Sequence, residues 1–261
     1  MLVTSNVRLT TGVFMKNHDK WQPSKYIFKK GRLTASRDRK EVGVASRLMA
    51  DLVAKFYDKT LRQHATGKLL DLGCGKVPLY LAYKEYITDS ICVDWENTLH
   101  KNEYLDFECD LTKDLPFEDN EFNTIILSDV LEHIPQPENL WKEMFRILST
   151  DGKLILNVPF YYWIHEQPHD YYRYTEFALK RFVDDSGLTL VQLECIGGSP
   201  EVFADFLAKH FQFLPLIGTP LAICIQYIIG IFIKTALGKK ISDKTSKAFP
   251  LGYHLVAKKM N

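Results

Sequence analysis

The sequence predicts an α/β protein whose parallel sheet is covered by helices on both faces. From Lys68 onward, runs that are apolar almost throughout alternate with segments of helical periodicity, as in buried parallel strands separated by helices. The expected strands are 68–72, 89–94, 104–109, 123–128, 153–158, 188–195 and 252–258, and the expected helices are 78–87, 138–148 and 175–186. The composition agrees, because 46% of the 261 residues are apolar and 25% are charged.

One more helix is expected ahead of the first strand, over 42–64. Its apolar face recurs at helical spacing through Val44, Leu48, Leu52, Val53 and Phe56. We treat residues 1–64 as a basic extension that ends in this helix. Residues 65–260 form the main domain, with an apolar helical insert over 200–248 before the last strand.

The net charge of +1 hides a strong asymmetry along the chain. Residues 1–66 hold 14 Lys/Arg against 5 Asp/Glu, residues 67–200 hold 11 against 24, and residues 201–261 hold 8 against 3. Basic ends around an acidic middle suggest an anionic partner, and a solvated surface is the alternative. The five cysteines show no metal-like spacing and the first residues lack a signal-peptide pattern, so we expect reduced thiols and a cytoplasmic protein.

The segment LLDLGCG (69–75) is typical of a ligand-binding turn. A buried strand reaches Asp71, and Gly73 and Gly75 then allow a tight turn and a close approach of a ligand to the backbone. In open α/β sheets, ligands bind beyond the carboxyl ends of the strands, which is where this turn would lie. The turn therefore predicts a nucleotide site.

The identity of the nucleotide follows from the neighbouring carboxylates. A dinucleotide-binding turn needs a third glycine where this sequence has Pro78, and Asp71 would repel a pyrophosphate. Asp94 ends the second strand, where a carboxylate can accept both hydroxyls of a ribose, and Asp110 could accept from an adenine amino group. An adenosine with a positively charged tail fits these carboxylates better than NAD does.

Together with LPFEDNEFNTIILSDVLEHI (115–134) and WKEMFRILSTDGKLILNVP (141–159), these residues resemble class I S-adenosylmethionine-dependent methyltransferases of the type 11 subgroup. The resemblance covers roughly 65–195 and the final strand. It implies a Rossmann-like, seven-stranded, mainly parallel sheet whose last strand is antiparallel, with S-adenosylmethionine as the cofactor. It assigns the cofactor site to Asp71, Gly73, Cys74, Gly75, Asp94, Asp110, Leu111 and Ser128.

Two features depart from a simple match. The family's frequent third glycine is replaced by Val77, although the following Pro78 suits a first helical turn. Some relatives bind Mg²⁺ through residues at the spacing of Asp129, Glu132 and His133, which His165 or His169 could complete. Because the LEH triplet is also common in relatives without a metal, we expect no metal here.

An aromatic and charged segment, 159–174, follows the fifth strand and is expected to hold the acceptor. Methyl transfer depends on positioning, and an alcohol acceptor must also lose a proton, a step for which histidine suits neutral pH. We therefore expect His169 or His165 as the base, with Asp170 as a partner. The expected acceptor contacts are Tyr161, Tyr162, Tyr171 and Arg173. The alternative is that the aromatic rings only pack and an Arg173–Asp170 pair only holds the loop.

Residues 211–233 carry no charged side chain, yet a single membrane span would separate two strands of one sheet. Pro215, Gly218 and Pro220 suggest two shorter helices, and lysines follow, as in a segment that lies on an anionic bilayer. A substrate lid, a dimer interface or a buried helix pair are the alternatives.

The function expected is O-methylation of a sugar or lipid-linked glycan in surface-polysaccharide assembly, because HEQPHDYYRYT (165–175) resembles methyltransferases of that setting. We place the enzyme in the cytoplasm, with contact to the inner membrane face left open. The alternatives are a quinone or another small apolar acceptor, or a binding protein that does not turn over. No motif indicates a nucleic-acid partner.

Overall fold

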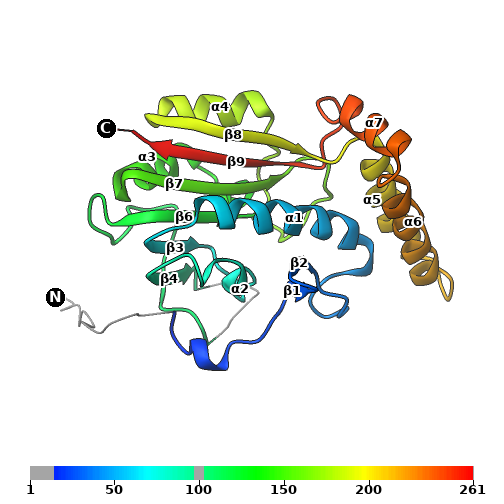
Figure 1. The fold of residues 1–261 in the computed structure, drawn as a ribbon, viewed down its shortest axis with the longest axis horizontal. Coiled ribbons are helices and arrows are strands. Elements are labelled where there is room, and N and C mark those ends of the chain that lie inside the picture. The colour runs from blue at the N-terminus through cyan, green and yellow to red at the C-terminus, as the bar shows by residue number, and fades with distance from the viewer. Residues whose placement is uncertain (1–14, 97–102, 261) are drawn as a thin grey trace.

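The computed structural model describes residues 15–96 and 103–260, and its centre is a seven-stranded sheet (Figure 1). The strand order is β5-β4-β3-β6-β7-β9-β8. The strands are β3 (Lys68–Leu72), β4 (Asp89–Asp94), β5 (Phe107–Glu108), β6 (Phe122–Ser128), β7 (Leu148–Pro159), β8 (Leu188–Ile196) and β9 (Gly252–Lys259). All pairings from β5 to β7 are parallel, whereas β9 runs antiparallel to both β7 and β8. The expected sheet with an antiparallel last strand is confirmed.

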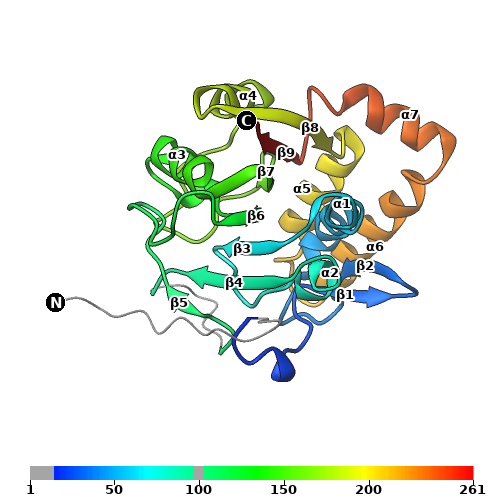
Figure 2. The same ribbon diagram turned by 60° about the vertical axis from the view of Figure 1, so that its left-hand side comes forward.

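Helices cover both faces of the sheet, as the turned view in Figure 2 shows. On one face lie α1 (Arg47–His64) and α2 (Tyr80–Tyr83), and on the other lie α3 (Pro137–Ile147) and α4 (Glu176–Asp185). Alternate strand residues enter two separate cores: Leu69 packs with the α1 side and Leu70 with the α3 side. This alternation is the period of two that side chains follow along a strand, and burial on both faces explains the continuous apolar runs.

Two expected elements are shorter than the sequence pattern suggested. The strand expected over 104–109 is reduced to β5, because the Asp106 side chain accepts the Cys92 backbone N–H at 2.8 Å in place of a ladder carbonyl. The helix expected over 78–87 is reduced to α2, after which the chain turns back to start β4 at Asp89. In both places the element in the folded chain is shorter than the residue pattern.

The segment before α1 contains structure that the residue pattern did not predict. A hairpin of β1 (Tyr26–Lys29) and β2 (Arg32–Ala35) lies beside α1, preceded by η1 (His18–Lys20) and followed by η2 (Val44–Ser46). The Asp51 carboxylate on α1 accepts the Ala35 backbone N–H at 3.0 Å and so joins the hairpin to the helix. This segment therefore packs on the sheet domain.

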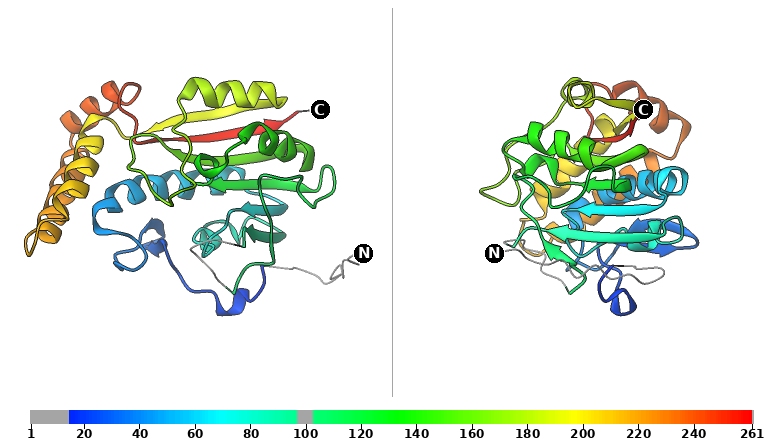
Figure 3. Two further views of the ribbon diagram at one scale, coloured as in Figure 1. Left: turned by 180° about the vertical axis from the view of Figure 1, so that it is seen from behind. Right: turned by 90° about the vertical axis from the view of Figure 1, so that its left-hand side faces the viewer.

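Three helices form the insert between the last two strands in sequence: α5 (Ser199–Phe211), α6 (Gly218–Phe232) and α7 (Ala236–Thr245). They gather at one end of the molecule (Figure 1 and Figure 3). The expected break in the apolar run lies between the end of α5 at Phe211 and the start of α6 at Gly218. Pro220 lies in the first turn of α6, where it removes no helical hydrogen bond.

The insert leaves the sheet and returns to it, since β8 pairs with β9. Among the described residues, no single helix is long and apolar enough to cross a membrane. Only α6 and α7 taken together reach that length and composition, and they are bent by 98°.

Candidate functional site

A cavity of about 1020 Å³ opens at the carboxyl ends of β3, β4 and β6. All eight side chains or glycines expected to bind the cofactor line it. Other lining residues come from the amino-terminal segment and from the loop that follows β7 (residues 160–174, here called the acceptor loop). The fold therefore brings the cofactor residues and part of the acceptor loop to one space.

The turn after β3 adopts backbone angles that favour glycine. Gly73 has φ +70°, and a Cβ there would lie 2.5 Å from Val130 Cγ2, so any side chain would clash as well as strain the backbone. Val77, where the family often has glycine, has φ +48° despite its branched side chain. The Trp21 indole N–H donates to the Val77 carbonyl oxygen at 3.0 Å and helps to hold this strained turn.

Two buried carboxylates lie at the base of the cavity. Burial, and then the nearby Asp94, raise the pKa of Asp71 to about 7. The Asp94 carboxylate accepts the backbone N–H groups of Gly75 at 2.9 Å and of Trp95 at 2.8 Å. A carboxylate in this position is a suitable acceptor for ribose hydroxyls.

Asp110 occupies the part of the cavity expected to receive the adenine. Its carboxylate accepts from the hydroxyl of Thr112 at 2.7 Å and pairs with Lys113 at 3.0 Å. These contacts lower the pKa of Asp110 to about 2. The carboxylate is therefore ionised and held in place, beside Leu111 in the same wall.

Several lining residues were missed by the sequence reasoning. Trp95 follows Asp94 and contacts the His169 ring edge-on, with centroids 5.0 Å apart. Lys25 of the amino-terminal segment donates to Asp129 at 2.8 Å. Burial lowers the pKa of Lys25, but the Asp129 carboxylate outweighs burial and raises this pKa above its ordinary value. The excess of basic residues before α1 was the only signal for this contact.

Two of the expected acceptor-site residues face the cavity. His169 and Tyr171 both line it, and His169 Nδ1 lies 3.2 Å from the Tyr171 hydroxyl. With Trp95, they form a group of aromatic side chains in the cavity lining, here called the aromatic wall. His169 and Tyr171 are therefore side chains of the acceptor loop that can meet a substrate.

Asp170, Arg173 and His165, which were also expected in the acceptor site, lie outside the cavity lining. The Asp170 side chain is 1% exposed and forms a two-point ion pair with Arg173, at 2.5 and 2.8 Å. Arg173 also donates to the Trp163 and Tyr172 carbonyl oxygens, so its guanidinium fastens the loop. None of the three lines the cavity, and the Asp170–Arg173 pair fits the alternative in which it holds the loop.

Tyr161 and Tyr162 also point away from the cavity, toward the insert. Tyr162 donates to or accepts from the Ser46 hydroxyl at 3.1 Å, and the Lys209 ammonium lies 3.3 Å from its ring centre. Tyr161 stacks with Phe249, with ring centroids 6.2 Å apart. The structure does not bring these two tyrosines to the cavity, because the loop turns them against α5 and the segment before β9.

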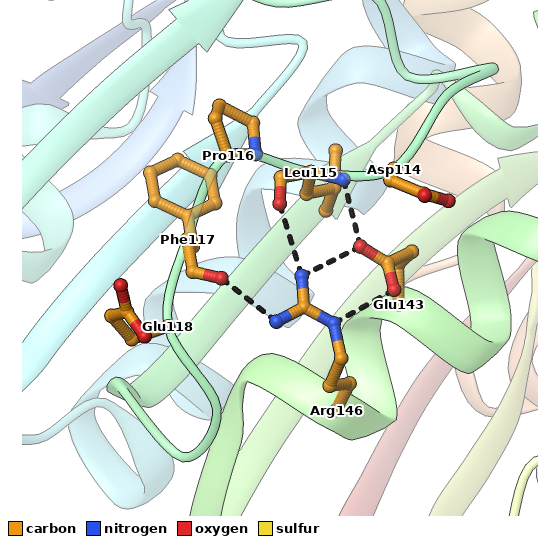
Figure 4. Close-up of a pocket in the computed structure, with 7 residues that line it drawn as sticks. All are labelled: Asp114, Leu115, Pro116, Phe117, Glu118, Glu143 and Arg146. Atoms are coloured by element: carbon orange, nitrogen blue, oxygen red, sulfur yellow. Dashed lines mark hydrogen bonds and ion pairs between the residues drawn. The ribbon is translucent and has the colours of Figure 1, made fainter. Parts of the chain in front are cut away.

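A second, more open hollow of about 530 Å³ lies beside Arg146 on α3. Figure 4 shows that the guanidinium points into a ring of acceptors. It donates to the Leu115 and Phe117 carbonyl oxygens and pairs with Glu143 at 2.7 Å. Because these partners occupy the guanidinium, the hollow is a structural feature that joins α3 to the segment before β6.

Comparisons with known proteins agree with this geometry. A family model described as a methyltransferase domain matches residues 70–156, from β3 to β7. No curated protein matches the sequence. The structure of the [4+2]-cyclase SpnF is 18% identical over 91% of this chain and 87% of its own, with a TM-score of 0.52.

Two methyltransferase structures are also similar. Phosphoethanolamine N-methyltransferase 2 from Haemonchus contortus, in complex with S-adenosylmethionine, is 16% identical over 86% of this chain, with a TM-score of 0.52. This chain spans 59% of that protein's length. A SAM-dependent methyltransferase from Archaeoglobus fulgidus is 16% identical over 77% of this chain and 92% of its own, with a TM-score of 0.50. At such identities the likeness shows the fold.

Over residues 70–156 the chain matches a methyltransferase domain, and its cofactor is S-adenosylmethionine. The site fits that cofactor, because Gly73 leaves a backbone cradle that a Cβ would fill. Asp71 offers a carboxylate to an ammonium group and Asp94 one to ribose hydroxyls. S-adenosylmethionine supplies a methyl group on a positively charged sulfur.

Proposed function

We propose that this protein transfers a methyl group to a hydroxyl of a sugar or lipid-linked glycan. The observation that carries the proposal is the position of His169, which lines the same cavity as the cofactor residues and contacts Trp95 and Tyr171. Aromatic faces stack on sugar rings, and a histidine suits removal of a hydroxyl proton near neutral pH. A phenolic or apolar acceptor is the second outcome that the experiments below distinguish.

In the proposed reaction each residue of the site has one task. Asp71, Asp94 and the glycine turn bind and orient the cofactor, and the aromatic wall places the acceptor oxygen in line with the methyl group. His169 Nε2 takes the proton that the hydroxyl loses as the new O–C bond forms and the C–S bond breaks. The Tyr171 hydroxyl, 3.2 Å from His169 Nδ1, holds the imidazole in place.

The cofactor part is tested by calorimetry with S-adenosylhomocysteine and with NAD. Asp94→Ala should weaken S-adenosylhomocysteine binding by about 1.5–3 kcal/mol, because hydrogen bonds to a charged group are lost. Glu108→Ala, a second carboxyl variant in the same cavity wall, is the matched control. Binding of NAD in preference to S-adenosylhomocysteine contradicts the assignment.

The acceptor part is tested with methyl-labelled S-adenosylmethionine and an extract of lipid-linked oligosaccharides, followed by acid hydrolysis and mass spectrometry of the sugars. Wild type should yield O-methyl sugars, and His169→Ala should reduce the rate by about 10²–10⁴-fold with unchanged cofactor affinity. His210→Ala, an exposed histidine on α5, is the control. Label that appears only in quinones overturns the sugar assignment, and cofactor binding with no transfer to any acceptor indicates a binding protein.

We also propose that the insert rests on an anionic membrane at the cytoplasmic face. Along α6, the apolar side chains Ile223, Tyr227, Ile228 and Ile231 recur at helical spacing and are 41–69% exposed. The buried stripe of the same helix is Gly218, Ala222 and Gln226. A large apolar surface that faces outward is unusual in a protein without a partner.

Two further features favour a lipid surface as the partner. The exposed lysines that follow α6 are Lys234, Lys239, Lys240, Lys244 and Lys247, and each adds about 1 kcal/mol of attraction near anionic lipid. Trp163 of the acceptor loop lies against Phe213 of the insert, with ring centroids 6.2 Å apart. The insert therefore connects the proposed membrane face with the loop that carries His169, as a lipid-linked acceptor requires.

Flotation with phosphatidylglycerol–phosphatidylcholine vesicles tests the membrane contact. Wild type should float at low salt and less at high salt, and Ile228→Asp with Ile231→Asp should abolish flotation without loss of stability, because both residues are about half exposed. Phe177→Asp, at an exposed position on α4, is the matched control. Wild type that stays at the bottom of the gradient at low salt contradicts the proposal.

A further inference from the structure

Three side chains, one of which lines the cavity, have the composition of a metal-binding site. Glu132 and His133 belong to η3 (Leu131–His133), which follows β6, and His165 belongs to the acceptor loop. The Nε2 atoms of His133 and His165 each lie 3.7 Å from Glu132 Oε1. The three ligand atoms all lie within 4.8 Å of one another. Two imidazoles and one carboxylate thus converge on a single point.

The outer nitrogen of each histidine has an acceptor partner. His133 Nδ1 lies 2.8 Å from the His169 carbonyl oxygen, and because a carbonyl only accepts, Nδ1 carries the proton. His165 Nδ1 lies 3.3 Å from a carboxylate oxygen of Asp170, which fixes the same tautomer. Each Nε2 is therefore left with a lone pair that points toward Glu132. Histidines that bind metals usually have this outer arrangement.

Glu132 lacks the hydrogen bonds that a buried carboxyl group needs. Its side chain is fully buried, and neither of its oxygens has a hydrogen-bond partner within the described residues. The buried Nε2 of His133 also lacks one. A distance of 3.7 Å is too long for a hydrogen bond, so a protonated Glu132 would not be satisfied either. A tetrahedral ion with bonds of about 2.0–2.1 Å holds its ligand atoms about 3.3 Å apart. The two imidazole nitrogens, each 3.7 Å from Glu132 Oε1, would therefore move slightly closer to it when the ion binds.

We propose that Glu132, His133 and His165 bind one divalent transition-metal ion of the zinc class. Imidazole nitrogen favours Zn²⁺ over Mg²⁺, which prefers oxygen ligands and retained water. On the cavity side, Glu166 Oε2 lies 3.9 Å from His133 Nε2 and supplies a fourth ligand. Two carboxylates then balance the charge of the ion. This site departs from the expectation of no metal.

Asp129, the first ligand in the Mg²⁺ alternative, takes no part. Its carboxylate is held by Lys25 and by the Asn157 side-chain amide, each of which donates to a different oxygen. The ligand atoms of Glu132 and His133 are closed to solvent. The ion therefore fastens the acceptor loop to η3 and positions His169, whose carbonyl accepts from His133.

The test measures metal content and needs no acceptor, so its result is independent of the proposed methyl transfer. Full-length protein is stripped with a chelator, dialysed and reloaded with Zn²⁺ or Co²⁺, and the metal is counted by elemental analysis. We expect one ion per chain, a visible Co²⁺ spectrum typical of tetrahedral coordination and a rise in Tm on loading. Glu132→Gln and His165→Asn should each weaken Zn²⁺ binding by about 100-fold or more.

The matched control is His210→Asn, which should bind Zn²⁺ as wild type does. Far-UV circular dichroism and S-adenosylhomocysteine binding show whether each variant is folded, and His165→Asn lies in a loop, where folding is least at risk. Wild type that retains no Zn²⁺ overturns the proposal. So does Zn²⁺ binding that both ligand variants preserve, or Mg²⁺ binding that is tighter than Zn²⁺ binding.

Discussion

The raised pKa of Asp71 makes cofactor binding depend on pH. Burial and the neighbouring Asp94 raise this pKa to about 7, so the empty site holds a proton on Asp71 below neutral pH. An ammonium group of the cofactor favours the ionised carboxylate, so binding must release that proton. The affinity for S-adenosylhomocysteine should therefore be constant above pH 7 and fall below it, by about tenfold between pH 8 and pH 6.

Calorimetry in two buffers of different ionisation enthalpy measures both the affinity and the number of protons released on binding. At pH 6.5, binding should release about three quarters of a proton, the fraction of Asp71 that is protonated there. Asp71→Asn should weaken binding and remove the pH dependence. Asp110→Asn should keep it, because the pKa of Asp110 is about 2 and that group stays ionised throughout. An affinity that does not change between pH 6 and pH 8, or a slope that survives in Asp71→Asn, would refute the reasoning.

Two further predictions concern stability. Gly73→Ala should lower Tm by several degrees more than Gly31→Ala and weaken cofactor binding. Both glycines have positive φ, but a Cβ at Gly73 would lie 2.5 Å from Val130, whereas a Cβ at Gly31 would meet nothing within 4 Å. Equal losses of Tm in the two variants would show that the contact with Val130 is unimportant. Burial lowers the pKa of His254 to about 3, so stability present above pH 6.5 is lost as the pH falls, by about 2 kcal/mol between pH 6.5 and pH 5. His254→Gln should make urea-unfolding stability less dependent on pH in this window, and an unchanged slope would assign the loss to other groups.

The sequence alone determined the sheet and the cofactor end of the site. The apolar runs at β3, β4 and β6 are nearly continuous because both faces of these strands are buried, so the strands could be located without any long-range information. Asp71, Gly73 and Asp94 lie at strand ends, and parallel strands bring their carboxyl ends to one edge. For these residues, position along the chain fixes position in space.

Only the tertiary structure decided what the acceptor loop does. Its aromatic and charged residues are adjacent in sequence, but the loop directs His169 and Tyr171 to the cavity and Tyr161 and Tyr162 to the insert. No periodicity applies to an irregular loop, so side-chain direction depends on long-range partners. The bidentate pair of Asp170 with Arg173 is one such determinant, and sequence separation could not show whether it bound substrate or held the loop.

Contacts between segments that are distant in sequence could likewise not be predicted from the sequence. Lys25 donates to Asp129, 104 positions away in sequence. Trp21 donates to the carbonyl oxygen of Val77, 56 positions away, and so supports the strained backbone turn there. The convergence of His165 on Glu132 and His133 joins the loop after β7 to the turn after β6. The pattern of residues along a chain encodes its local periodicity, whereas the pairing of single polar groups from separate segments is set by the geometry of the completed fold.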